Sequence, residues 1–323
     1  MEYIIMTFSF LGGLGMFLYG MQIMAGGLEN LSGNRIKTMI SSITTNHYKG
    51  IAVGAIVTAL IQSSSATSIM VVGMVNAGIM NLTQAAGVIM GANIGTTITA
   101  WLISLSEWTV CFRPEIIAPL IVGLGSFFLL FAKSDRKKVI AEISVGFGIL
   151  FIGLNFMSDA MEPVQHISIF YSTFKLLGTY PLLGILAGAI VTALIQSSSA
   201  SVGILQTMAI NGFVGWNTAI FITLGQNIGT CVTALLSSIN TDRTAKQAAV
   251  FHLLFNLLGA IIIGPVFILI FTLNPDFAHS RINSIQISIF HTVFNIVNTL
   301  ILLPFISQLV DITKFFVKER KIV

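Results

Sequence analysis

The chain contains the same 18-residue segment twice, and this duplication constrains its fold more than any other feature. GIAVGAIVTALIQSSSAT at 50–67 returns as GILAGAIVTALIQSSSAS at 184–201, with 15 of 18 positions identical. A second block, GANIGTTIT at 91–99, returns as GQNIGTCVT at 225–233, so both blocks recur at one spacing of 134 residues. The sequence therefore predicts two structurally equivalent halves, with nothing inserted between the two blocks of either half.

Composition places these halves in a lipid bilayer. Of the 323 residues, 55% are apolar and 9% are charged, whereas about a quarter of a soluble domain is charged. The only charged residue before the first apolar segment is Glu2, and no basic residue precedes it. We therefore expect this segment to be a membrane span and not a signal peptide. The basic residues form no patch that could follow a phosphate backbone, which argues against nucleic acid. Cys111 and Cys231 have no metal-ligand spacing, and we expect no metal other than sodium.

The lengths of the apolar segments predict both spans and hairpins. A hydrocarbon core of about 30 Å takes about 20 helical residues to cross. Each QSSS is flanked by shorter segments of 11 to 14 residues, or about 17–21 Å of helix. We therefore expect two re-entrant hairpins, near 50–80 and 184–213, with their non-helical tips buried in protein. The predicted half-helices are 51–61, 66–79, 185–195 and 200–213, and seven full spans are predicted near 7–31, 83–105, 115–132, 139–161, 217–238, 247–272 and 284–311.

Lysine and arginine predict the orientation. This arrangement places 13 of the 16 on one side, leaving Arg113, Lys175 and Arg281 on the other. Because short cytoplasmic loops are enriched in basic residues, we expect a plasma-membrane protein with a cytoplasmic C-terminus and an outer N-terminus. Each half has an odd number of crossings, so its two copies would have inverted topology. The predicted fold is an all-α polytopic membrane protein with repeats at 1–133 and 134–273, then an extra span and a basic tail at 274–323.

The duplicated tips are the candidate binding site. Gln62, Ser63, Ser64 and Ser65, and Gln196, Ser197, Ser198 and Ser199, lie where one half-helix ends and the next begins. The first amides of a helix lack partners within it and favour anions, and serine hydroxyls add neutral donors. Alternatively, serine and glutamine only hold helices together in lipid. Matched copies at two tips favour a site for a tetrahedral oxyanion.

Hydroxyl groups near the tips are candidate sodium ligands. Thr58 and Thr192 lie four residues before the tip glutamines and share their helix face, and Thr67 and Ser201 follow on the outgoing arms. Discontinuous helices offer such neutral oxygens to Na⁺, although threonine is also ordinary in packing. No predicted span contains Lys or Arg, so we expect cations to neutralise a bound anion.

Polar residues outside the tips have several interpretations. A proton-coupled mechanism would need a titratable group, and the candidates are His252, His291, Glu142 and Asp159. For the two histidines, interhelical hydrogen bonding is the favoured interpretation. Glycines such as Gly12, Gly13, Gly20, Gly26 and Gly27 suit packing either within a protomer or between two, so a homodimer stays open.

The two QSSS hairpins, each followed by a GxNIGT span, resemble the type II sodium-phosphate cotransporter family in a compact bacterial form. The resemblance implies sodium-coupled phosphate transport, with phosphate cradled by the two QSSS tips. It adds Asn93 and Asn227 as phosphate contacts and Thr97 and Thr230 as sodium contacts, while Cys231 departs from the duplicated threonine. Some bacterial relatives carry a PhoU-like domain, and we expect none in this chain.

We therefore expect a secondary active transporter, with no catalytic residue and no cofactor. Its partners would be inorganic phosphate, sodium ions and the bilayer. Three alternatives remain open: a symporter or exporter of another small oxyanion or dicarboxylate, an anion channel, because half-helices also line selectivity filters, and a non-transporting scaffold.

Overall fold

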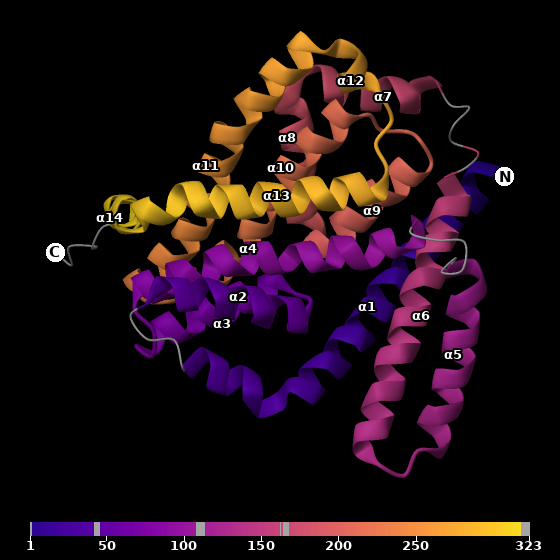
Figure 1. Ribbon diagram of the computed structural model, residues 1–323, viewed down its shortest axis with the longest axis horizontal. Helices are drawn as coiled ribbons and strands as arrows, with labels where there is room; N and C mark the ends of the chain where they lie inside the picture. The colour runs from indigo at the N-terminus through magenta and orange to yellow at the C-terminus, as the bar shows by residue number, and fades with distance from the viewer. Residues whose placement is uncertain (1, 42–45, 108–113, 162, 164–167, 318–323) are drawn as a thin grey trace.

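The computed structural model describes residues 2–41, 46–107, 114–161, 163 and 168–317, and within these ranges the chain is almost entirely helical (Figure 1). The only β pairing in the described part is an isolated bridge between Gly215 and Arg281. Figure 1 shows the two ends of the chain at opposite ends of the long axis. The elements are α1 Glu2–Ser41, α2 His47–Ile61, α3 Ser64–Asn76, α4 Leu82–Ser104, η1 Leu105–Glu107, α5 Pro114–Phe131, α6 Asp135–Met161, α7 Ser168–Thr179, α8 Pro181–Ile195, α9 Ser198–Ile210, α10 Trp216–Ser237, α11 Arg243–Leu273, α12 Pro275–His279, α13 Ser284–Leu302, η4 Leu303–Phe305 and α14 Ile306–Phe316.

The long helices agree with most of the predicted spans. In the described residues, six helical segments are long and apolar enough to cross a membrane. They correspond to six of the seven predicted spans; in the remaining one, at 115–132, the apolar helix Ile116–Phe131 is shorter than that criterion requires. The last span is broken, because α13 ends at Leu302 and a short 3₁₀ turn containing Pro304 leads into α14. The number and apolar character of these helices make the chain an integral membrane protein.

Each segment in which a hairpin was predicted forms a pair of short helices joined at the QSSS turn. Helices α2 and α3 have 15 and 13 residues, and α8 and α9 have the same two lengths. The incoming helices end at Ile61 and Ile195, the residues at which the sequence places the breaks.

The segment before the second hairpin differs from the prediction. Residues 168–179, which the sequence analysis left outside any span, form α7, and the chain bends by 113° between α7 and α8. Pro181 occupies the first turn of α8. Proline is tolerated in the first turn of a helix. Because it has no N–H, it cannot donate the hydrogen bond that would continue a preceding helix. The second hairpin is therefore preceded by an additional short helix that lies across it.

Glycines bring helices together at backbone distance. Helix α1 packs along α6, where a Cβ on Gly13 would lie 2.8 Å from the Gly153 carbonyl oxygen. In the GxNIGT blocks, a Cβ on Gly95 would lie 2.7 Å from Thr58 Cβ, and one on Gly229 would lie 2.8 Å from Thr192 Cβ. Each hairpin is thus packed against the long helix that follows it. Gly20 and Gly27 also pack on α6, whereas Gly12 and Gly26 face open space.

Candidate functional site

The two QSSS turns have the same backbone conformation. Gln62 has φ 57° and ψ 24°, and Gln196 has φ 57° and ψ 23°. They are the only non-glycine residues with positive φ in the described part of the chain. A left-handed conformation costs an L-residue about 1–2 kcal/mol, and such strain clusters at functional sites. Each turn therefore reverses the chain at one strained glutamine, which glycine would occupy at lower cost.

A serine caps the second helix of each hairpin. Ser63 Oγ accepts a hydrogen bond from the Ala66 amide at 3.1 Å, and Ser197 Oγ accepts one from the Ala200 amide at 3.2 Å. These caps use one free amide of each helix start. The amides of the first two helical residues, Ser64 and Ser65 in one hairpin and Ser198 and Ser199 in the other, have no partner within the helix. They lie at the positive end of its dipole. Each tip is therefore an electropositive helix start without a charged side chain.

The two tips meet. Ser64 Oγ and Ser198 Oγ are 3.4 Å apart, although the residues are 134 positions apart in the chain. A cavity of about 450 Å³ opens beside this contact, and all eight residues of the two QSSS segments line it. Ser64, Ser198 and Ser199 are buried, whereas the Gln196 side chain is exposed to the opening. The structure thus brings the whole predicted phosphate-binding set of the turns into one place.

Helix α1 completes the cavity. Gln22 and Glu29 lie on its lining, together with apolar residues of α1 such as Met21. The sequence analysis did not include α1 in the site, although Glu29 matches Glu162 at an offset of 133 residues and so belongs to the weaker part of the duplication. Among the described residues that line the cavity, Glu29 is the only charged one, and none is Lys or Arg. An anion here would therefore be held by neutral donors beside a carboxylate.

The predicted sodium ligands of the hairpins lie one turn behind the tips. Thr58 Oγ1 donates to Thr67 Oγ1 at 2.9 Å, and Thr192 Oγ1 donates to Ser201 Oγ at 2.8 Å. All four are buried. The two pairs occupy equivalent positions and tie the incoming arm of each hairpin to its outgoing arm.

Two further side chains, both on the long helices, hydrogen-bond to the hairpins and were not predicted from the sequence. Thr99 Oγ1 donates to Gln62 Oε1 at 3.0 Å, which fixes the side chain of the strained residue. In the second half, Gln226 Nε2 donates to Ser201 Oγ at 3.0 Å, and its Oε1 has no protein partner. Gln226 replaces Ala92 of the first half, and this break in an otherwise close duplication was the available signal.

The residues added by the resemblance lie on the long helices. Asn93 Nδ2 donates to the Ile89 carbonyl at 2.9 Å, and Asn227 Nδ2 donates to the Thr223 carbonyl at 3.1 Å. The hydroxyls of Thr97 and Thr230 also donate to carbonyls of their own helices. These four residues are buried, and none of them lines the cavity between the tips.

The interhelical hydrogen bonds expected of the two histidines are not seen for the His252 ring. Neither ring nitrogen of His252 has a protein partner, nor does Nδ1 of His291. Asn256 and Asn295 each donate to the backbone carbonyl of the histidine one turn earlier in the same helix, and Asn256 Nδ2 also donates to Cys231 Sγ of α10 at 3.3 Å. Cys231 is buried, with its Sγ 3.4 Å from the His252 carbonyl oxygen.

The sequence profile of the Na⁺/Pi-cotransporter family matches residues 16–159 and 168–273. The chain belongs to this family. This family is a family of phosphate transporters and not of enzymes. The matched ranges contain both hairpins, both long helices that pack on them, and the α1 residues of the cavity.

Individual relatives agree with the profile. The chain is similar to the uncharacterized protein YqeW of Bacillus subtilis, with 29% identity over 80% of this chain and 81% of the relative. It is 27% identical to the provisionally named inorganic phosphate export protein YjbB of Salmonella typhimurium over 79% of this chain, which spans only 46% of that protein. Human sodium-dependent phosphate transport protein 2B shares 35% identity over 30% of this chain and 14% of its own length. No solved structure matches.

Proposed function

We propose that this member of the Na⁺/Pi-cotransporter family is a sodium-coupled secondary transporter that holds inorganic phosphate between its two QSSS turns. The contact between Ser64 and Ser198 at 3.4 Å carries the proposal. It joins two helix starts whose free amides and hydroxyls face one cavity, and such a group of neutral donors suits a tetrahedral oxyanion.

Charge supports the coupling to sodium. An unpaired anion in a low-dielectric site is costly, and the described lining offers no basic side chain while Glu29 adds a further negative charge. Co-bound cations, at least two for a phosphate anion and one carboxylate, would offset these charges. The hydroxyl pairs Thr58–Thr67 and Thr192–Ser201 lie one turn behind the tips and offer the hard oxygen ligands that discontinuous helices present to Na⁺.

Helix length supports re-entrant hairpins. Helices of 15 and 13 residues are about 22 and 20 Å long at 1.5 Å per residue, which is less than a hydrocarbon core of about 30 Å. Each hairpin therefore enters part of the way and returns. Tips that meet from opposite sides suit inverted repeats, with alternating access arising as one half moves against the other.

The direction of transport is a separate question, because the relatives differ. One is named for phosphate export and others for sodium-dependent phosphate transport. In a coupled transporter the gradients set the direction, so one site can serve either flux. Imposing the sodium gradient in each direction across the same vesicle would measure both.

The test is uptake of radiolabelled phosphate by purified protein in proteoliposomes, with sodium, lithium or choline outside. Sodium-dependent uptake that arsenate inhibits more strongly than succinate is the expected result. Uptake that persists equally in choline would refute the coupling. Currents far above transporter turnover and independent of sodium would instead identify a channel.

A further inference from the structure

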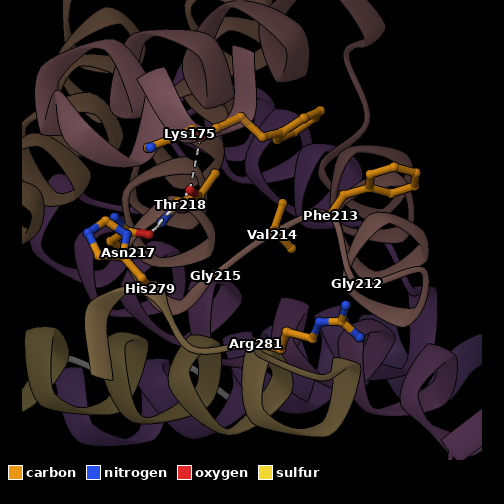
Figure 2. A pocket seen from close by; sticks show the side chains of 10 residues that line it. Lys175, Gly212, Phe213, Val214, Gly215, Asn217, Thr218, His279 and Arg281 are labelled. Atoms are coloured by element: carbon orange, nitrogen blue, oxygen red, sulfur yellow. Dashed lines mark hydrogen bonds between the residues drawn. The ribbon is translucent and has the colours of Figure 1, made fainter. Parts of the chain in front are cut away.

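A second polar pocket lies at the base of the second hairpin, away from the tips (Figure 2). It has a volume of about 380 Å³ and lies between α7, the loop from α9 to α10, and the segment from α12 to α13. Because α9 has 13 residues, about 20 Å of helix separates this pocket from the Ser198 tip. The pocket is therefore distinct from the candidate transport site.

The charge of this pocket is opposite to that of the tip cavity. Lys175 lies on one side of the opening, and His279 and Arg281 lie on the other (Figure 2). None of its ten described lining residues is acidic, and within the described part of the chain no carboxylate pairs with Lys175 or Arg281. Two basic side chains with no carboxylate partner beside one hollow produce a local positive potential.

The walls of the pocket are held in place by backbone contacts. Gly215 pairs with Arg281 in the isolated β-bridge, and the Trp216 amide donates to the Ser280 carbonyl at 3.2 Å. Thr218 Oγ1 donates to the Phe174 carbonyl at 3.1 Å, which fixes α7 and its Lys175 to the start of α10.

The Arg281 guanidinium lies against the backbone of Gly212. Gly212 has φ +73°, and a Cβ there would lie 3.3 Å from Arg281 Cζ. The bare backbone of this glycine therefore lets the planar guanidinium lie close to the loop. Such a fork can bind two oxygens of one phosphate.

The start of α10 faces the same hollow. Its N-cap is Gly215, which makes no side-chain cap. The equivalent helix of the first half, α4, is instead closed by a reciprocal capping box between Asn81 and Gln84. The amides of Trp216 and Thr218 nevertheless have acceptors, in the Ser280 carbonyl and Asn217 Oδ1, so the pocket depends on its basic side chains more than on this helix start.

We propose that this pocket is a second binding site for a phosphate group, outside the transport site, with Lys175 and Arg281 as its principal ligands. The charge distribution predicts that both residues lie on the outer side of the membrane. A site here would concentrate inorganic phosphate at the outer mouth of the second hairpin and raise its rate of capture. This role rests on the proposed function, but the binding does not. The headgroup of an anionic lipid has the same chemistry.

Binding can be measured without transport through the reactivity of the Lys175 amine. The purified protein is acylated in phosphatidylcholine vesicles, and the modification of each lysine is quantified by mass spectrometry. Inorganic phosphate should slow acylation of Lys175 but not of Lys138. The same protection is expected in the Ser64→Ala, Ser198→Ala double variant, and it should be lost in Arg281→Gln. If chloride at equal ionic strength protects equally, or if phosphate does not protect, the proposal is wrong.

Two further experiments distinguish inorganic phosphate from a lipid headgroup and test the proposed role in phosphate capture. Protection by phosphatidylglycerol vesicles without phosphate would assign the pocket to a lipid headgroup and overturn the capture role. For that role, Lys175→Gln with Arg281→Gln should lower kcat/KM for external phosphate about tenfold at low salt, with kcat unchanged. Lys137→Gln with Lys138→Gln removes the same net charge elsewhere and should have no effect, while Arg281→Lys should restore part of the loss. Equal effects of the two charge-matched pairs would overturn the capture role.

Discussion

The contact between the two tips predicts that two serines, far apart in sequence, contribute equally to phosphate binding. Ser64 Oγ and Ser198 Oγ lie 3.4 Å apart in equivalent turns. An oxyanion beside both hydroxyls would accept one hydrogen bond from each. A hydrogen bond to a charged group contributes about 1.5–3 kcal/mol, which is about 10- to 150-fold in Kd. Ser64→Ala and Ser198→Ala should therefore each weaken phosphate binding by a factor in this range.

The assay is isothermal titration of phosphate into purified protein at saturating sodium, with Tm measured in parallel. Both variants should retain their Tm, because neither hydroxyl caps a helix; Ser63 and Ser197 perform that role. Ser144→Ala is the matched control, since its hydroxyl donates to the Ile140 carbonyl of its own helix and it lines no described pocket. Its Kd should equal that of the wild type.

One result would refute the reasoning. If one of the two variants folds normally and changes Kd less than about threefold, which corresponds to under 1 kcal/mol, phosphate does not lie between the tips. A loss confined to Ser198→Ala would place it on the second hairpin alone. In the double variant, the loss of binding free energy should differ from the sum of the two single losses, because the two hydroxyls bind one ligand.

Three other predictions test the surroundings of the tips. Gly229→Ala should destabilise the protein by about 1–3 kcal/mol through overpacking against Thr192, while Gly73→Ala, whose Cβ would meet nothing within 4 Å, should be neutral or stabilising; equal Tm values for both would contradict the close packing. Gln196→Gly should raise Tm, because glycine avoids the cost of about 1–2 kcal/mol that a left-handed conformation imposes on other residues. The same change should weaken phosphate binding; unchanged binding would show that the side-chain amide of Gln196 does not contact phosphate. Thr192→Val should raise the sodium concentration for half-maximal uptake and Thr192→Ser should not, so identical sodium curves for the two would exclude this hydroxyl as a ligand.

The sequence predicted the parts of the fold that duplication and apolar length control. The breaks after Ile61 and Ile195 followed from two matched segments too short to cross a bilayer. The meeting of the tips was expected because hairpins of inverted topology would enter from opposite faces. The polar residues of the turns were recognisable because both copies retain them.

Features without a local signal were missed. Helix α7 is short; Pro181 marks the boundary between α7 and α8, but the 113° angle between the two helices depends on packing that the sequence does not display. Gln22 and Glu29 line the cavity because α1 packs beside it; the match of Glu29 with Glu162 in the second half was the available signal. Of the expected interhelical hydrogen bonds near the histidines, the structure shows one from Asn256 to Cys231 Sγ, whereas the His252 ring has no protein partner.

The glycine contacts have a consequence for how the molecule can move. Each hairpin touches its long helix almost backbone to backbone, so the pair resists sliding as a well-packed core does. The described contact between the tips, by contrast, is one pair of hydroxyls at 3.4 Å. A ligand at the tips would therefore meet two turns that are each held by a rigid helix pair and that touch each other through a single hydroxyl contact, while the halves are joined elsewhere by contacts such as that of Gln206 Nε2 with the Ala100 carbonyl.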